Sequence, residues 1–441
     1  MKKYFELIKT CLNLFLSARF PDTYQSLGKC DVLLCCHDAD RGDTLDGLPY
    51  SKLIDSVSED LMDKGWVCRQ FAHPFSVLTG NKAWGNPASG NRRYLLLGIY
   101  RKICKFFPFL SQINLSKNTK LPLSNPDTFY HELFEITQPS CVITIGSPDA
   151  MCRAARCRSI PVVELLHGIG YTPVPWGWDQ EPPCNLPTGI LSLDDVSTKT
   201  FSNLHSQGIE VKQIPHPFFR RFLNEESRQK LPPEWQQKPT WLPAGKTIIL
   251  VSLQWGYDGD HGAYTEFAGI LNNGLIPDQV IDAVEQTRDS VFWLFRLHPV
   301  QLRDNKYNHH RRFLDKLIQN HPNCEWRESS TLPLPLILSY CAGHVTMGSM
   351  TTYEAAFMAV RSLLLCPRLK PNGSHSCSFP DLRELGFAEL GDFDTGMIVK
   401  WVTTVSHCSH PFGTSANTDT DWNSAVEWML GRVYKQEELS S

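Results

Sequence analysis

Short apolar runs alternate with amphipathic stretches along this chain, and this alternation constrains its fold more than any other feature. The run CDVLLCC at 30–36 is typical of a strand, and SKLIDSVSEDLMDKG at 51–65 is typical of a helix that ends at a glycine. Strands and helices that alternate in this way form parallel sheets with helices packed on their faces. The pattern therefore predicts an α/β protein.

The alternation runs in two blocks, and the segment between them is rich in proline. Residues 230–245 hold four prolines, and proline removes a backbone donor and clashes inside helices. We expect no regular structure there and interpret the segment as a linker between a first domain at 1–229 and a second at 246–441. The last helix, expected within 421–436, can pack back on the first domain. Ligands of such sheets bind beyond the carboxyl ends of the strands, so two facing Rossmann-like domains would place the site in the cleft between them.

Composition excludes several classes of protein. With 42% hydrophobic and 11% aromatic residues the chain is too apolar to be disordered, and it shows no collagen or coiled-coil repeat. A net charge of −3 gives no bulk attraction to nucleic acid, so we expect no nucleic-acid partner. The 15 cysteines include no C-x-x-C pair, and most sit in apolar surroundings. We interpret them as free thiols in a reducing, cytoplasmic compartment.

Two segments bear on membrane contact. No run of about 18 apolar residues occurs, which predicts no transmembrane helix. Residues 1–20 combine helical periodicity with an early lysine pair, so an amphipathic helix or a cleaved signal peptide fits. Residues 92–110 mix arginine and lysine with large apolar side chains, which fits a helix lying on anionic lipid or a core helix with a solvated basic face. If residues 1–20 form an amphipathic helix and residues 92–110 a helix that lies on lipid, the protein is expected on the inner face of the cytoplasmic membrane.

A strand that runs into hydroxyl residues and then a helix is the strongest local signal. In GHVTMGSMTTYEAAFMA the predicted strand is followed by Ser349, and Thr351 and Thr352 can cap the helix that carries Glu354. The free N–H groups and the positive dipole end of a helix suit a phosphate. Glu354 can accept hydrogen bonds from the hydroxyls of a ribose, or it serves only as a favourable first-turn residue of the helix.

The motif FRLHP places Arg296 and His298 directly after a second apolar strand. An arginine and a histidine at a strand end can hold a diphosphate or a leaving phosphate. The alternative is a strand-end histidine bonded to nearby backbone.

Polar residues also follow two strands of the first block. In ELLHGIGYTP, His167 comes after a strand and before Gly168, so it can act as a general base next to a backbone that a ligand can approach closely. In HDADRGD, Asp38 and Asp40 can serve as a base, bind acceptor hydroxyls or cap the next helix. The sequence DGDHG at 258–262 completes no metal-binding pattern, and we interpret it as a polar loop.

Three motifs in this order, LLHG, FRLHP and GSMTTYEAAFMAVRSLLL, make the chain resemble a glycosyltransferase of the GT-B architecture over about residues 30–400. It is similar to bacterial surface-polysaccharide enzymes such as capsule-type Kdo transferases, sialyltransferases and glycerophosphotransferases. The resemblance implies transfer of a sugar from a nucleotide-activated donor to a growing surface glycan of capsule, O-antigen or lipopolysaccharide type. It implies no metal and no cofactor beyond the nucleotide-sugar co-substrate.

The same resemblance assigns roles to residues. His298 and Arg296 would contact the donor phosphate, as would the hydroxyls of Ser349, Thr351 and Thr352, and Glu354 would contact the ribose or the base. A glycan or lipid-linked acceptor would bind the first domain, with His167 or Asp40 as the catalytic base and Asp38 and Gly168 on the acceptor side. Leu166 stands where several relatives have glutamine, and Arg296-Leu297 stands where lysine-proline is common. Two other functions fit the pattern: a nucleotide-sugar epimerase of similar shape, and a non-catalytic binding protein with this architecture.

Overall fold

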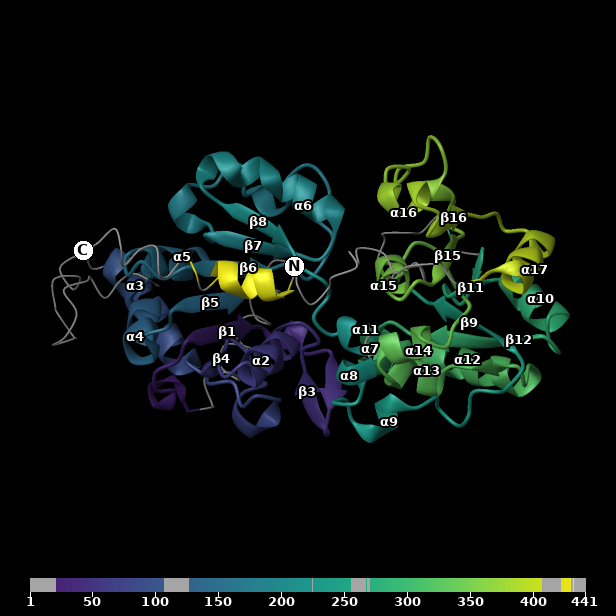
Figure 1. Ribbon diagram of the computed structural model, residues 1–441, viewed down its shortest axis with the longest axis horizontal. Coiled ribbons are helices and arrows are strands. Elements are labelled where there is room, and N and C mark those ends of the chain that lie inside the picture. The colour runs from purple at the N-terminus through teal and green to yellow at the C-terminus, as the bar shows by residue number, and fades with distance from the viewer. Residues whose placement is uncertain are drawn as a thin grey trace. The chain divides into compact units, whose positions relative to one another are not determined.

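The computed structural model divides the chain into two units, each built around its own parallel sheet (Figure 1). The first unit comprises residues 1–218 and 417–441, and the second comprises residues 219–416. The structure describes residues 21–106, 127–223, 225–254, 267, 270–406, 422–429 and 431. The N-terminal segment 1–20, the polar loop 258–262 and part of the basic segment 92–110 therefore lie outside the described residues.

The first unit contains a six-stranded parallel sheet in the order β4-β1-β5-β6-β7-β8. Neighbouring strands pair in parallel throughout. The chain builds outward from β1 to β4 on one side and from β5 to β8 on the other, so the topological switch point lies between β1 and β5. The strands are β1 (Val32–Cys36), β4 (Cys68–Ala72), β5 (Cys141–Thr144), β6 (Val162–Leu165), β7 (Gly189–Ser192) and β8 (Glu210–Gln213).

Alternating side chains of β1 build a core on each face of this sheet. Val32, Leu34 and Cys36 pack toward α2 (Ile54–Asp63), whereas Leu33 and Cys35 pack toward α4 (Asp127–Thr137) and α5 (Asp149–Arg156). A strand that is apolar on both faces is the pattern expected for a parallel sheet covered on both sides. Residues 422–429 are helical and complete the α2 face with Trp422, Ala425, Val426 and Met429.

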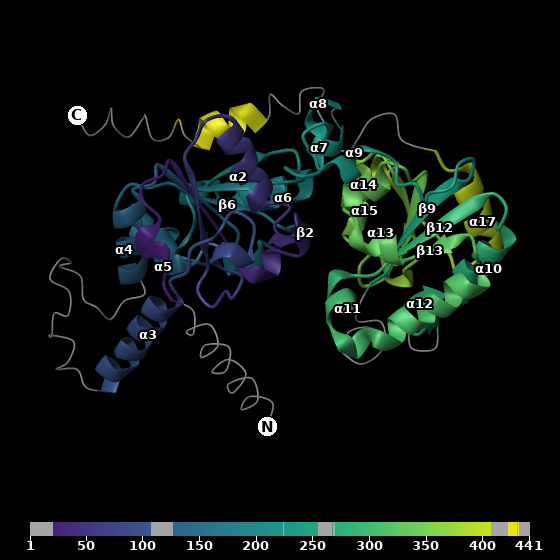
Figure 2. The same ribbon diagram turned by 90° about the horizontal axis from the view of Figure 1, so that it is seen from below.

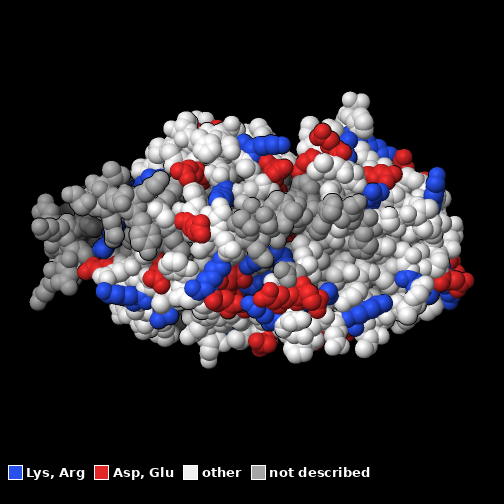
Figure 3. All heavy atoms as spheres, in the orientation of Figure 1, with Lys and Arg blue, Asp and Glu red and all other residues white. Residues whose placement is uncertain are grey.

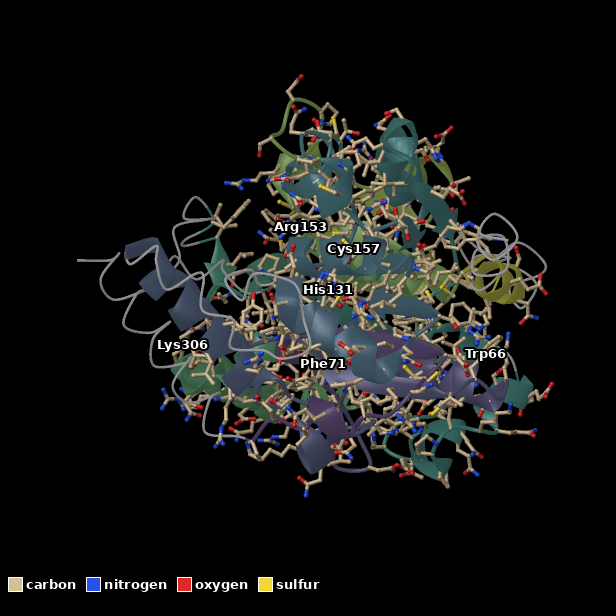
Figure 4. All side chains as sticks on the ribbon, turned by 90° about the vertical axis from the view of Figure 1, so that its left-hand side faces the viewer. Trp66, Phe71, His131, Arg153, Cys157 and Lys306 are labelled. Atoms are coloured by element: carbon tan, nitrogen blue, oxygen red, sulfur yellow. The ribbon has the colours of Figure 1, made fainter. Side chains whose placement is uncertain are left out.

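The helices α4 and α5 are also joined by an ion pair at their surface. The Arg153 guanidinium donates to both carboxylate oxygens of Asp127, at 2.8 and 3.0 Å, and to the side-chain oxygen of Asn185 at 2.6 Å. Figure 4 shows Arg153 on α5 near His131 on α4. This bidentate pair fixes the register of two helices that cover the same face of the sheet.

The second unit contains a six-stranded parallel sheet in the order β13-β12-β9-β14-β15-β16. Numbered from its first strand, this is the order 3-2-1-4-5-6 of dinucleotide-binding Rossmann domains. Its switch point lies between β9 and β14. The strands are β9 (Thr247–Ser252), β12 (Val291–Arg296), β13 (Cys324–Glu325), β14 (Gly343–Thr346), β15 (Arg361–Leu364) and β16 (Ala388–Leu390).

Helices cover both faces of the second sheet (Figure 2). Its main helices are α10 (Asp278–Gln286), α12 (Asn308–Asn320), α14 (Leu334–Leu338), α15 (Thr351–Phe357) and α17 (Thr395–Thr404). The remaining elements include α3 (Asn91–Phe106), α6 (Asp195–Phe201), α7 (Arg220–Leu223), α8 (Glu225–Arg228), α9 (Pro233–Gln236), α11 (Pro299–Arg303), α13 (Arg327–Thr331), α16 (Pro380–Glu384), and the antiparallel pairs β2 (Asp43–Leu45) with β3 (Leu48–Tyr50) and β10 (Leu271–Asn272) with β11 (Ile276–Pro277).

The expectation that residues 230–245 lack regular structure is wrong. The helix α9 forms inside this segment with prolines at its first positions, where a missing N–H costs no intrahelical bond. Leu231, Trp235 and Leu242 are buried, and the whole segment belongs to the second unit. These three buried side chains pack the segment that was expected to be a linker into the second unit.

The prediction of two Rossmann-like α/β domains is confirmed, whereas their facing arrangement and the cleft between them stay predictions. Among the helices that the structure describes, none combines the length and apolar character needed to cross a membrane. On the face shown in Figure 3, basic and acidic side chains of the described residues are interspersed. The described cysteines carry free thiols, most of them buried.

Candidate functional site

The first cluster of functional groups lies at the carboxyl end of β1, beside the switch point of the first sheet. His37 and Asp40 close a single turn there: the His37 N–H donates to the Asp40 carboxylate at 3.0 Å, and the Ala39 N–H donates to the His37 ring at 3.3 Å. The turn holds the Asp40 carboxylate against the edge of the sheet. Ligands of α/β sheets bind at this kind of position.

Asp40 lies close enough to His167, which follows β6, for their charges to interact. Burial raises the pKa of Asp40, while the hydrogen bond from the His37 N–H and the positive charges of His167 and His37 act in the opposite direction. The two residues that the sequence offered as alternative bases therefore lie within electrostatic range of each other. A carboxylate with a raised pKa near an exposed imidazole is a candidate for proton transfer.

Glu164, the first residue of the ELLHG sequence at 164–168, is a buried acid that the sequence analysis did not single out. Its carboxylate accepts hydrogen bonds from the backbone N–H of Gly146 at 2.7 Å and of Ser147 at 2.8 Å, and from the Ser147 hydroxyl. Burial raises the pKa of Glu164 to about 7, and the nearby Asp40 acts in the same direction. The sequence could have indicated this residue, because Glu164 interrupts the apolar strand VVELL. A carboxylate inside such a strand is seldom buried without a hydrogen-bond or ion-pair partner.

Arg41 anchors the Asp40 turn to the body of the unit. Its guanidinium is buried and donates to Asp55 at 2.6 Å, to the side-chain oxygen of Gln70 at 3.0 Å and to the carbonyl of Trp84 at 3.2 Å. Burial raises the pKa of Asp55 to about 6, with the Arg41 charge opposing that rise. The loop that carries Asp40 is therefore tied to α2 and β4 by a buried ion pair.

The two acceptor-side candidates, Asp38 and Gly168, have different surroundings. The Asp38 carboxylate accepts from the backbone N–H of Val77 at 2.6 Å and of Leu78 at 3.1 Å, so it holds the loop that follows β4. Gly168 is exposed, and a Cβ added there would meet none of the described atoms within 4 Å. Space for a ligand therefore opens directly after His167, and the roles of both residues in acceptor binding stay predictions.

His73, which directly follows β4, stabilises the carboxyl edge of the first sheet. Its Nε2 lies 2.9 Å from the Thr144 hydroxyl and 3.1 Å from the Ile145 carbonyl, across the ends of β4 and β5. Burial lowers the pKa of His73 to about 4, which keeps the ring neutral near pH 7. The ring therefore supports the end of β5 as a hydrogen-bonding group without adding charge to the cluster.

The second set of predicted residues follows β14, at the switch point of the second sheet. The Thr346 hydroxyl donates to the Ser252 carbonyl at 2.9 Å and so joins the ends of β14 and β9. The Ser349 hydroxyl lies 3.0 Å from that of Thr351 and accepts from the Thr351 N–H at 3.3 Å. These two hydroxyls meet where the chain enters α15.

Thr352 and Glu354 occupy different parts of the first turn of α15. Thr352 is fully buried and its hydroxyl donates to the Ser349 carbonyl at 2.7 Å, so its side chain shapes the turn. The expectation that Thr351 and Thr352 cap the helix is wrong for both, because the N-cap position falls on Met350 and no side chain caps α15 there. Glu354 is half-buried within the first turn. The donor-site roles of Ser349, Thr351, Thr352 and Glu354 stay predictions, with Ser349 and Thr351 having the more accessible hydroxyls.

Arg296 is the last residue of β12, which pairs with β9 beside the switch point, and His298 follows this strand. His298 is the N-cap of α11: its ring accepts from the Val300 N–H at 3.3 Å, and its own N–H donates to the Gln301 side chain at 2.9 Å. Arg296 donates to the carbonyls of Ser329 and, at 2.8 Å, of Leu332. Arg296 thereby fastens α13 to the sheet, and its contact with a phosphate stays a prediction.

The chain matches no protein-family model, and no curated protein is significantly similar to it in sequence. Solved structures do resemble it in fold. The UDP-GlcNAc 2-epimerase of Neisseria meningitidis, bound to UDP-GlcNAc, has a TM-score of 0.52 at 13% identity and covers 90% of this chain and 99% of its own. The UDP-GlcNAc 2-epimerase of Methanocaldococcus jannaschii has a TM-score of 0.51 at 11% identity, with the same coverage of 90% and 99%. At this identity the likeness shows the fold alone: two Rossmann-like domains, the fold class of the GT-B architecture.

Proposed function

We propose that the chain is a glycosyltransferase that moves a sugar from a nucleotide-activated donor to a hydroxyl of an acceptor glycan. The observation that supports this proposal is that Asp40 and His167 both follow strands at the carboxyl edge of the first sheet and lie within electrostatic range of each other. A paired carboxylate and imidazole at a switch point is suited to removing a proton from a hydroxyl. The second unit supplies the Rossmann strand order and the hydroxyl-lined turn that suit a nucleotide.

In this proposal the donor binds the second unit. The hydroxyls of Ser349 and Thr351 and the ring of His298 contact the diphosphate, and Glu354 accepts hydrogen bonds from the ribose hydroxyls. The backbone N–H groups at the start of α15 lie in the same turn and favour negative charge. These fixed donors stabilise the nucleoside diphosphate as it leaves.

The proposed transfer needs only the nucleotide sugar and the acceptor hydroxyl as reactants. The Asp40–His167 pair takes the proton from the acceptor hydroxyl, whose oxygen forms a bond to the anomeric carbon of the donor sugar. The bond from that carbon to the diphosphate oxygen breaks, and its electron pair leaves with the nucleoside diphosphate. The proton then passes from the pair to solvent, because His167 is exposed.

The acceptor in this proposal is a growing bacterial surface glycan of capsule, O-antigen or lipopolysaccharide type, built at the cytoplasmic face of the membrane. The support for this finer assignment is the order of the LLHG, FRLHP and GSMTTYEAAF motifs. On α3, Leu96 is 60% exposed one helical turn after the exposed Arg92, which suits contact with a membrane surface, whereas Arg93 is paired with Glu132.

A nucleotide-sugar epimerase is the second candidate, because two structures that share this fold at TM-scores of 0.52 and 0.51 are UDP-GlcNAc 2-epimerases. The two functions differ in their need for an acceptor. An epimerase converts a nucleotide sugar alone, whereas a transferase releases the nucleoside diphosphate only as a sugar joins an acceptor.

The first experiment measures the thermal midpoint of the purified protein with CMP, CDP, UDP, GDP and ADP, because a ligand that binds the folded state raises the midpoint. The sugar donors of the nucleotide that binds are then incubated with and without bacterial glycan acceptors. Acceptor-dependent release of the nucleotide supports the transferase. A changed sugar without any acceptor supports the epimerase, and a lack of binding to all five nucleotides supports a non-catalytic protein.

A further inference from the structure

An exposed tryptophan stands in the loop that follows the HG motif of the first unit. Trp176 is 59% exposed, and its backbone has φ 61° and ψ 8°. This left-handed conformation is an outlier for a bulky residue, and residues held in it cluster at ligand-binding and active sites. Both exposure of an indole ring and backbone strain oppose folding, which makes this position unusual.

Trp176 is held in place by two other rings. Its centroid lies 5.1 Å from that of Trp178 and 5.9 Å from that of Phe201, and Trp178 and Phe201 are 5.7 Å apart. The three rings therefore contact one another and leave no room for a cation between them, as a cage for quaternary ammonium would need. They form a platform, defined here as Trp176, Trp178 and Phe201, that presents indole surface to solvent.

The platform is tied to the candidate site through Phe201. A Cβ added to Gly170 would lie 2.5 Å from the Phe201 ring, so the backbone three residues after His167 rests on this ring. The Gly170 N–H also donates to the Ser197 hydroxyl at 2.9 Å, and Asp194 holds Ser197 in turn. His167 and Trp176 lie in the same connection between β6 and β7, and this connection rests on α6 through Ser197 and Phe201.

Polar side chains follow the platform directly. Asp179, Gln180 and Glu181 are exposed, and the Asp179 carboxylate accepts from the Gln180 amide at 3.0 Å. Carboxylates and amides can bind the hydroxyls of a sugar. Two carboxylates also repel an anionic lipid surface or a polyanion, so the charge beside the platform favours an uncharged partner.

We propose that Trp176 binds the apolar face of a pyranose ring in a neutral stretch of the acceptor glycan. One face of a pyranose presents C–H bonds, which pack on the electron-rich face of an indole, while its equatorial hydroxyls point outward to polar side chains. The platform fits a ring next to the one that carries the reacting hydroxyl. This subsite rests on the proposed function only in naming the bound sugar as the acceptor.

The test follows the indole N–H of Trp176 by NMR in ¹⁵N-labelled protein, with the signal assigned by its loss in Trp176→Phe. The probes are cellohexaose, chitohexaose and maltohexaose at millimolar concentration, and vesicles of phosphatidylglycerol. We expect at least one hexasaccharide to shift the Trp176 signal in a saturable way and the vesicles to leave it unchanged. A signal that no hexasaccharide moves, or one that moves with vesicles or with protein concentration alone, overturns the proposal.

Transfer kinetics separate this proposal from the proposed function. Trp176→Ala is expected to raise KM for the acceptor about 3- to 10-fold while the donor KM is unchanged, and Trp176→Phe is expected to retain part of the acceptor affinity. Met62→Ala is the control, because Met62 is an exposed apolar residue in the last turn of α2, at the opposite edge of the same sheet. Sugar binding without any transfer activity would support the sugar-binding role of Trp176 and contradict the transferase. Transfer activity with an acceptor KM that is unchanged in Trp176→Ala would contradict the sugar-binding role alone.

Discussion

Ser147 donates its backbone N–H to the carboxylate of Glu164 over 2.8 Å, and so a buried acid on β6 fixes the loop that leaves β5. Burial raises the pKa of Glu164 from 4.5 to about 7. The folded state therefore binds this proton more tightly than the unfolded chain does. Stability from this group is fully present below about pH 4.5 and is lost as the pH rises through about 7.

Glu164→Gln removes this titration. We expect the free energy of unfolding of the wild type, measured by urea denaturation, to fall between pH 5 and pH 8 relative to that of Glu164→Gln. The exposed Glu384 provides the control, because Glu384→Gln should leave the wild-type slope unchanged. Equal slopes for the wild type and Glu164→Gln would show that Glu164 does not titrate in this range.

The buried pair of Arg41 and Asp55 is expected to be sensitive to loss of one partner. Arg41→Met leaves the Asp55 carboxylate buried without its cation, and breaking such a pair costs about 3–5 kcal/mol. The exposed Arg312 offers a matched control, and Arg312→Met should stay within about 0.5 kcal/mol of the wild type. A loss below about 1 kcal/mol in Arg41→Met would mean that the loop relaxes and rehydrates Asp55.

Asp40 and His167 are expected to act as one unit in catalysis. Asp40→Asn and His167→Asn should each lower kcat by about 10²- to 10⁴-fold, and the double variant should lose little more than either alone. Nucleotide binding, measured by thermal shift, should be unchanged. His321→Asn is the control, since His321 directly follows α12 at the amino edge of the second sheet. Additive losses would indicate that the two residues serve separate steps.

Glu354 is expected to decide nucleotide affinity. A nucleotide at about 100 times its Kd stabilises the folded state by about 2.7 kcal/mol, and Glu354→Ala should remove most of the resulting rise in the thermal midpoint. Asp289, which is exposed and precedes β12 at the amino edge of the sheet, supplies the matched variant. Asp289→Ala should keep the full shift, and a full shift in Glu354→Ala would remove Glu354 from the donor site.

The backbone at Trp176 gives a prediction about stability. Glycine adopts the left-handed conformation without strain, whereas alanine there costs roughly 1 kcal/mol. Trp176→Gly is therefore expected to have a higher thermal midpoint than Trp176→Ala, although glycine normally destabilises a fold. A lower midpoint for the glycine variant would show that this turn changes conformation once the indole is removed.

The sequence predicted the fold class because the apolar runs and the helices between them depend on local pattern. It also placed His167 and Asp40 after strands, and in a parallel sheet such positions share one edge. Their proximity could not be predicted, because it depends on the strand order β1-β5-β6, which is set by long-range packing. The sequence therefore offered the two residues as alternatives, and the structure places them within electrostatic range of each other.

Two features were missed for identifiable physical reasons. Proline density at 230–245 suggested a linker, but prolines at the first positions of α9 are compatible with a helix, and Trp235 buries its ring beside them. The anchoring of Asp40 by Arg41 required knowledge that Asp55 and Gln70 approach from separate elements. The first signal is local and was misinterpreted, whereas the second joins separate stretches of sequence.

The first unit is discontinuous, since Trp422 and its neighbours complete a core that begins with β1. During synthesis the ribosome releases the whole second unit before these residues emerge. Apolar side chains on the α2 face of the first sheet therefore stay exposed while about 200 further residues are synthesised, at about 5–20 residues per second. The core of the first unit is complete only after translation has passed residue 416. A ribosome that stalls within the second unit would leave a nascent chain with exposed apolar surface, which is a substrate for chaperones.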